Sequence, residues 1–145
     1  MIDPSVQLKA FDQLDAVTLY ALLKLRVDVF VVEQQCAYPE LDGRDTEPGT
    51  RHVWTADESG PLSYLRVLED PGPVARIGRV VVAAKARGTG AAGRLLDAAL
   101  GYLGDRPVVL DAQTHLVDFY ARYGFEATGP EFLDDGIPHV PMARR

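Results

Sequence analysis

The sequence predicts an α/β protein in which helices flank one mixed sheet, built as a single domain over residues 1–145. Two patterns lead to this class. Some segments repeat apolar residues every three or four positions, as amphipathic helices do, and others are short β-branched runs, as strands are. The chain contains no repeat and no linker long enough to separate two domains, and its length suits one domain. Interspersed helices and strands of this kind pack as layers around one core.

The N-terminal half is expected to supply one long helix and four strands. Apolar residues recur at three- and four-residue steps from Leu14 to Val32, and Asp12 or Asp15 is placed to cap the helix that they predict. A polar, turn-rich loop follows. The second and third strands form a hairpin, and the valine-rich fourth strand suits a buried central position. The strands are expected at residues 6–11, 52–57, 62–69 and 76–84, and the loop at residues 38–50.

The C-terminal half is expected to alternate helices and strands. A helix with an apolar stripe begins near Gly90, a strand covered on both faces follows over residues 106–113, and Gly124 stops a short second helix. Pro138 and Pro141 lie in the last apolar segment. Because proline cannot donate a backbone hydrogen bond, this segment is predicted to be an edge strand or an irregular piece. An exposed final strand could pair with a second copy, so both monomer and homodimer stay open.

Composition restricts the classes of partner. The formal net charge is −6 and no basic stripe is visible, so nucleic acid is not an expected partner. No apolar run has the length of a membrane span or the pattern of a signal peptide, which makes a cytoplasmic location the expectation. The three histidines lack ligand spacing, and no metal site is expected. Cys36 is the only cysteine and is interpreted as a small buried side chain, with a reactive thiol as the alternative.

A glycine-rich stretch opens the helix near Gly90. Gly88, Gly90 and Gly93 have the spacing G-x-G-x-x-G, and Asp111 ends a strand about twenty residues later, as in a dinucleotide site. The first amides of a helix carry a partial positive charge, and glycines let a phosphate approach them closely. The stretch therefore indicates a phosphate site, with an unliganded strand-to-helix turn as the alternative.

Three observations argue against a dinucleotide. Five residues intervene between Val82 and Gly88, whereas a dinucleotide-binding strand runs almost directly into its first glycine. Only 34 residues follow Asp111, too few for the rest of a doubly wound sheet. Arg87 directly precedes the glycines, where its guanidinium can pair with a phosphate held by the amides. No Lys-Ser or Lys-Thr follows, which excludes a P-loop.

At this point a resemblance becomes specific. The segment "VAAKARGTGAAGRLL" resembles the acyl-CoA signature of the GNAT N-acetyltransferases, with Arg87, Gly90 and Ala92 at its fixed positions and Ala84 where the family often has proline. "FYARYGF" matches the F-Y-x-x-x-G-F helix end of the same family. "LRVDVFVVEQQCAYPELDGRD", His52 and "FLDDGIPHVPM" further resemble the ElaA-like branch, whose substrates are poorly defined.

The resemblance implies a strongly twisted mixed sheet and an acetyl-CoA site. Strand 79–82 would splay from strand 108–112, and pantetheine would bond backbone groups of Val80 and Val82 in the gap. A backbone N–H there would polarise the thioester carbonyl. Gln113 stands where the family often has an asparagine facing the cofactor. The pyrophosphate would contact Arg87 and rest on the amides of the loop residues Gly88, Thr89, Gly90, Ala91, Ala92 and Gly93.

The resemblance also implies catalytic roles. Tyr120 is expected to be the general acid, since a phenol stays protonated at pH 7 and can protonate a departing thiolate. Its alternative is a core aromatic. Glu33 is the first candidate for the general base, acting through water, and its alternative is a helix-end charge or a salt bridge with Arg26 or Arg51. Weaker candidates for the base are His52, Asp42, Asp45 and Asp134.

The expected reaction is transfer of acetyl from acetyl-CoA to a primary amine of a small molecule or peptide, by direct attack in a ternary complex. Two rivals remain at this stage. The first is a non-catalytic acyl-CoA-binding sensor or interaction module on the same fold, and the second is a dinucleotide oxidoreductase.

Overall fold

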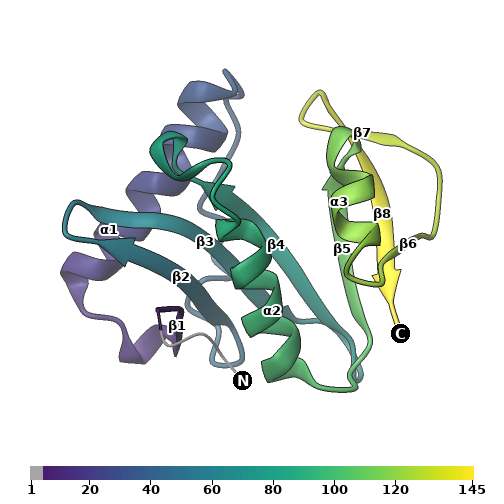
Figure 1. Cartoon of the computed structure of the whole chain (residues 1–145), viewed down its shortest axis with the longest axis horizontal. Coiled ribbons are helices and arrows are strands. Elements are labelled where there is room, and N and C mark those ends of the chain that lie inside the picture. Colours follow the sequence, from purple (N-terminus) through teal and green to yellow (C-terminus); the bar gives the residue numbers. More distant parts are fainter. Residues whose placement is uncertain (1–4) are drawn as a thin grey trace.

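The computed structural model describes residues 5–145 and shows one eight-stranded mixed sheet with helices on both faces (Figure 1). Residues 1–4 of the predicted domain lie outside this description. The strand order is β1-β2-β3-β4-β5-β8-β6, with β7 also paired to β8. The α-helices are α1 (Ala16–Arg26), α2 (Ala91–Leu103) and α3 (Val117–Ala121). The strands are β1 (Gln7–Ala10), β2 (Arg51–Asp57), β3 (Gly60–Glu69), β4 (Ala75–Val82), β5 (Val108–Gln113), β6 (Glu126–Ala127), β7 (Phe132–Asp134) and β8 (Ile137–Arg144).

The first helix begins at an aspartate cap and changes its winding before it ends. Asp15, one of the two predicted caps, accepts a hydrogen bond of 2.6 Å from the Thr18 amide. Past Arg26 the helix continues as a π-helical turn over Val27–Glu33, in which the Gln34 amide bonds the carbonyl of Val29, five residues back. The predicted long helix is confirmed, and its π-helical end forms part of the cleft described below.

Two apolar clusters hold the helices on opposite faces of the sheet. On the face that Figure 1 presents, α2 and α3 pack against buried residues of β2–β5, including Leu65, Ile77 and Leu110. On the other face, α1 packs against Trp54 and Tyr64. Burial of these side chains is the main stabilising term of the fold.

The centre of the sheet opens between β4 and β5. These parallel strands pair at Ala75 with Val108 and at Arg76 with Val109, and then diverge (Figure 1). A β-bulge causes β4 to bend: Tyr64 pairs with Val81 but Arg66 pairs with Gly78, and Arg79 takes a positive φ of 53°. The predicted splay of residues 79–82 from residues 108–112 is therefore present.

The prediction for the final strand was wrong. β8 lies inside the sheet, with β5 on one side and both β6 and β7 on the other. Pro141 is tolerated because its carbonyl accepts from the Thr128 amide, so its missing N–H faces the stretch between the short strands β6 and β7. On its other side, β8 pairs with β5 without a break in register, from Val108 opposite Arg144 to Gln113 opposite His139.

The environment of β5 also differs from the prediction. The strand was expected to be covered on both faces, but its side chains alternate between buried and accessible. Val108, Leu110 and Ala112 point into the core, whereas Asp111 and Gln113 face a cleft. The accessible face exists because α1 lies against β3 and β4 and leaves β5 and β8 open.

Candidate active site

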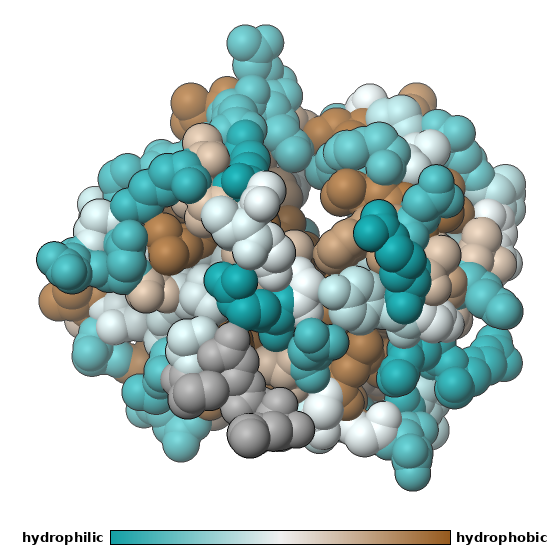
Figure 2. All heavy atoms as spheres, in the orientation of Figure 1, coloured by the Kyte–Doolittle hydropathy of each residue, from teal (hydrophilic) through white to brown (hydrophobic). Residues whose placement is uncertain are grey.

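A cleft of about 580 Å³ opens where β4 and β5 diverge. Its walls come from the π-helical turn after α1, from β4 and β5, from α3, and from the β7–β8 hairpin. Figure 2 shows the molecule hollowed between the α2 side and the α3 side, with hydrophobic atoms lining part of the hollow. Segments far apart in the sequence therefore meet in one channel that crosses the sheet.

The glycine loop stands at one end of this cleft and has the form of an anion cradle. Gly88 and Gly90 have φ values of 78° and 82°, a conformation that side-chain-bearing residues rarely adopt. Gly90 is the N-cap of α2, and within residues 5–145 no side chain caps that helix start. The first amides of α2 are thus available to an anion. Gly93 lies against the Tyr123 hydroxyl, which leaves no room for a side chain at this position.

The backbone of β4 offers hydrogen-bonding groups to the gap. The Ala83 amide donates to the Leu62 carbonyl of β3 at 2.8 Å. Because neighbouring residues of a strand point their N–H and C=O groups to opposite sides, those of Val82 point away from β3 and toward the gap, where the Val82 carbonyl accepts from Arg87 Nε. Val80, next to the bulge, lines the same gap. The orientation of Val82 is the one that the predicted pseudo-strand contact with pantetheine needs.

Arg87 and Glu33, two predicted site residues, bind each other. Arg87 Nη1 lies 2.8 Å from Glu33 Oε2, and Nη2 donates to Oε1 at 2.9 Å, which makes the pair bidentate. Arg87 Nε also donates to the Val82 carbonyl at 3.1 Å. Both side chains line the cleft, yet each is almost half exposed. The alternative expectation of a Glu33 salt bridge was right in kind, but the partner is neither Arg26 nor Arg51.

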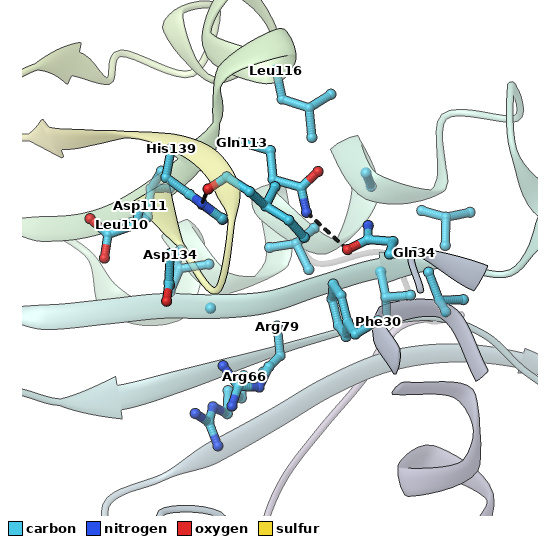
Figure 3. Close-up of a pocket in the computed structure, with 18 of the residues that line it drawn as sticks. Phe30, Gln34, Arg66, Arg79, Leu110, Asp111, Gln113, Leu116, Asp134 and His139 are labelled. Carbon is cyan, nitrogen blue, oxygen red and sulfur yellow. Dashed lines mark hydrogen bonds between the residues drawn. The ribbon is translucent and has the colours of Figure 1, made fainter. Parts of the chain in front are cut away.

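Tyr120 lies on α3 with its side chain buried in the wall of the cleft. Phe119 and Phe125 contact its ring edge to face. Burial raises the pKa of Tyr120 to about 12, so the phenol keeps its proton at neutral pH. Gln113 reaches across the cleft and donates to Gln34 Oε1 at 3.5 Å, as Figure 3 shows.

The far end of the cleft from the glycine loop has two walls of different chemistry. Figure 3 places Arg66 and Arg79 on the wall formed by β3 and β4, and Asp111, Asp134 and His139 on the wall formed by β5 and the β7–β8 hairpin. Asp134, a weaker candidate for the base, is therefore in the cleft. The His139 ring stacks on Phe132, and its Nδ1 donates to the Ile137 carbonyl at 2.7 Å.

Sequence reasoning missed a buried ionic network beneath the Arg66–Arg79 wall. Arg26 is 1% exposed and bonds Glu40 at 2.7 Å and Asp45 at 2.7 Å. Arg66 bonds Asp45 at 3.2 Å. Further members are Asp42, Arg79, Tyr38, Tyr64 and His52. Because the arginines lie 14 to 39 residues from the carboxylates that they bond, no local spacing signals that they meet.

This network corrects three of the weaker candidates for the base. Asp45 is held by Arg26 and Arg66, and Asp42 is bound by Arg66 with a pKa well below its usual range, mainly because of that hydrogen bond. His52 lies buried between Tyr64 and the Asp45 carbonyl. None of these three lines the cleft within the described part of the chain, so they hold the wall and do not face a substrate.

His52 predicts a pH dependence of stability. Its Nε2 donates to the Asp45 carbonyl, so in the neutral ring its Nδ1 accepts from the Tyr64 hydroxyl. Burial lowers the pKa of His52 below its ordinary 6.5, and Arg26 and Arg66 lower it further. The unfolded chain therefore gains a proton that the folded one does not as pH falls through about 6.5. We expect the free energy of unfolding to decrease between pH 7 and 5 in urea titrations.

The matched variant is His52→Asn. It lowers stability at every pH but flattens the profile between pH 7 and 5, because the group that titrates is gone. An unchanged slope in this variant would show that other groups cause the loss.

Known proteins resemble this chain in sequence over most of its length. A family model described as "Acetyltransferase (GNAT) domain" matches residues 18–145, which is most of the chain. The chain belongs to the GNAT acetyltransferase family. UPF0039 protein Rv2851c of Mycobacterium tuberculosis strain H37Rv is 55% identical over 135 residues, covering 90% of this chain and 86% of that protein. Protein ElaA of Escherichia coli K12 is 42% identical over 141 residues, covering 91% and 90%.

Solved structures show that this GNAT protein has the acyl-CoA N-acyltransferase fold. An acyl-CoA N-acyltransferase from Pseudomonas aeruginosa superposes with a TM-score of 0.92 at 42% identity, over 97% of this chain and 98% of that one. Escherichia coli ElaA superposes with a TM-score of 0.91 at 36% identity, over all of both chains. The resemblance to the ElaA-like branch is thus confirmed. Across residues 5–145, the helices are all too short or too polar to cross a membrane.

Proposed function

We propose that this GNAT protein is a cytoplasmic acetyltransferase that moves the acetyl group of acetyl-CoA to a primary amine of a small molecule or peptide. One observation carries the proposal: the Gly88–Gly90 loop at the start of α2 and the β4 residues Val80 and Val82 adjoin one continuous cleft. A ligand with a phosphate group at one end and an extended amide-containing arm fits that combination. Coenzyme A has both parts.

The related structures support a CoA-based donor. The Pseudomonas aeruginosa relative is described as an acyl-CoA N-acyltransferase. An aminoglycoside 6′-N-acetyltransferase complexed with coenzyme A has a TM-score of 0.74 at 15% identity, which supports the fold alone. The residues proposed to hold the donor are Arg87, the loop amides of Gly88, Thr89, Gly90, Ala91, Ala92 and Gly93, the backbone of Val80 and Val82, and the Gln113 side chain.

The proposed chemistry is direct transfer. The neutral amine attacks the thioester carbonyl carbon, the C–N bond forms, and the C–S bond breaks. Tyr120 gives its proton to the sulfur as the C–S bond breaks. The phenolate left behind has a pKa of about 12 and is a stronger base than the thiolate, whose pKa is near 8.5 by analogy with cysteine, so Tyr120 regains a proton from water. The ammonium proton passes through water to Glu33 once that carboxylate is free of Arg87. The acceptor enters between the Arg66–Arg79 wall and the β7–β8 hairpin.

An acceptor screen tests this function. The purified protein is mixed with acetyl-CoA and, in separate wells, with polyamines, amino acids, aminoglycosides or peptides, and free CoA is measured with a thiol reagent. We expect at least one amine to release CoA above the acceptor-free rate, with acetylated product detected by mass spectrometry. Release of CoA without any acetylated amine would contradict transfer.

A further inference from the structure

The Glu33–Arg87 pair links two segments that lie far apart in the sequence. Glu33 ends the π-helical turn after α1, and Arg87 precedes the glycine loop, 54 residues later. Both carboxylate oxygens are bonded to the guanidinium, and Arg87 Nε is bonded to the Val82 carbonyl. The guanidinium is thus folded back over the β4 backbone, with its charge neutralised.

Each of these two contacts competes with a contact that the donor needs. In the proposed complex, the pantetheine arm bonds the Val82 carbonyl, which already accepts from Arg87 Nε. The pyrophosphate there bonds the guanidinium that Glu33 already holds. A phosphate and a carboxylate on one guanidinium also repel each other, because both are negative. Glu33 and the donor phosphate therefore compete for the guanidinium of Arg87.

We propose that Glu33 is an internal competitor of the donor phosphate: it holds Arg87 across the pantetheine channel, and CoA binding displaces it. Glu33 then acts as a positioning residue that lowers donor affinity and is released toward the cleft only when the donor is in place. This inference rests on the proposed function, since it requires CoA to bind at the Arg87 loop.

The sign of the effect makes the inference testable. Removing the Glu33 charge by Glu33→Gln should tighten CoA binding by about two- to fivefold, the range measured for exposed ion pairs. Damage to the site would weaken binding instead. Glu33 is almost half exposed, so the variant is expected to fold, and circular dichroism checks that it does.

Two further variants separate the pair from general charge effects. Asp111→Asn removes an acid that lines the same cleft but pairs with Arg76, and it should leave CoA affinity unchanged. Arg87→Gln should weaken CoA binding about tenfold, because it loses bonds to a charged group. In the Arg87→Gln background, Glu33→Gln should no longer tighten binding, since its partner is gone.

The experiment is titration calorimetry with CoA on the wild type, the three single variants and the Glu33→Gln/Arg87→Gln double variant. Tighter binding in Glu33→Gln alone, lost in the double variant, supports the competition. Equal or weaker binding in Glu33→Gln overturns it, as does tightening that persists without Arg87 or that Asp111→Asn reproduces. A wild-type protein that binds no CoA would instead overturn the proposed function itself, and this inference with it.

Discussion

Replacing Tyr120 by phenylalanine is expected to lower the turnover of acetyl transfer by about 100-fold or more, the typical contribution of a general acid. The phenol is buried in the cleft wall, and its raised pKa of about 12 keeps it protonated at any pH where the enzyme is assayed. Without the hydroxyl, the thiolate must leave unprotonated or take its proton from water. The ring itself, which packs against Phe119 and Phe125, is kept by the substitution.

The readout is kcat with the best amine of the acceptor screen, together with CoA affinity by calorimetry. CoA should bind Tyr120→Phe within about twofold of wild type, because the hydroxyl acts on the leaving thiolate and not on the phosphate. The matched control is Tyr123→Phe, which removes a hydroxyl that packs against Gly93. That variant should keep wild-type turnover. Full activity in Tyr120→Phe would show that Tyr120 is not the general acid. A wild type with no turnover on any amine would favour the sensor alternative.

Replacing Arg26 by methionine is expected to destabilise the fold by about 3–5 kcal/mol, the usual cost of leaving a buried charge without its partner. Arg26 is 1% exposed and satisfies Glu40 and Asp45, which are themselves buried. Methionine preserves much of the side-chain volume, but both carboxylates lose the positive charge of Arg26 that pairs with them. For a domain of this size, the loss corresponds to a midpoint lower by roughly 10 °C or more.

Thermal and urea unfolding measure this effect, and α1 supplies its matched control. Lys24→Met removes a cation from the same helix, but Lys24 pairs with Asp28 on the surface, where both side chains are largely exposed. That variant should leave the midpoint unchanged within error. Equal decreases in the unfolding midpoint of the two variants would mean that burial of the Arg26 ion pairs does not stabilise the fold.

Much of the fold could be predicted because its signals are local. The apolar spacing between Leu14 and Val32 predicts a long helix, and the Asp15 cap is one residue from the helix start that the structure shows. The valine run of β4 predicts a central strand, which β4 is. The prediction for β8 failed because a local rule about proline was applied without its partners. Pro141 turns its missing N–H toward the stretch between β6 and β7, which only the tertiary structure defines.

The candidate site divides in the same way. The glycine loop and Arg87 form one short stretch, so its positive φ angles and free amides follow from a few adjacent residues. The Glu33–Arg87 pair spans 54 positions and depends on how a π-helical turn ends against β4. The buried ionic network beneath the Arg66–Arg79 wall likewise brings Arg26 to Glu40 and Asp45 across a long loop. Contacts of this kind carry no sequence period, so only the folded chain shows them.

Titration calorimetry with acetyl-CoA and with NADH, on the wild type and on Arg87→Glu, measures whether the glycine loop binds an acyl-CoA. We expect the wild type to bind acetyl-CoA and not NADH. We also expect Arg87→Glu to weaken acetyl-CoA binding by about tenfold or more, since hydrogen bonds between charged groups contribute roughly 1.5–3 kcal/mol. NADH binding without acetyl-CoA binding would contradict an acyl-CoA site.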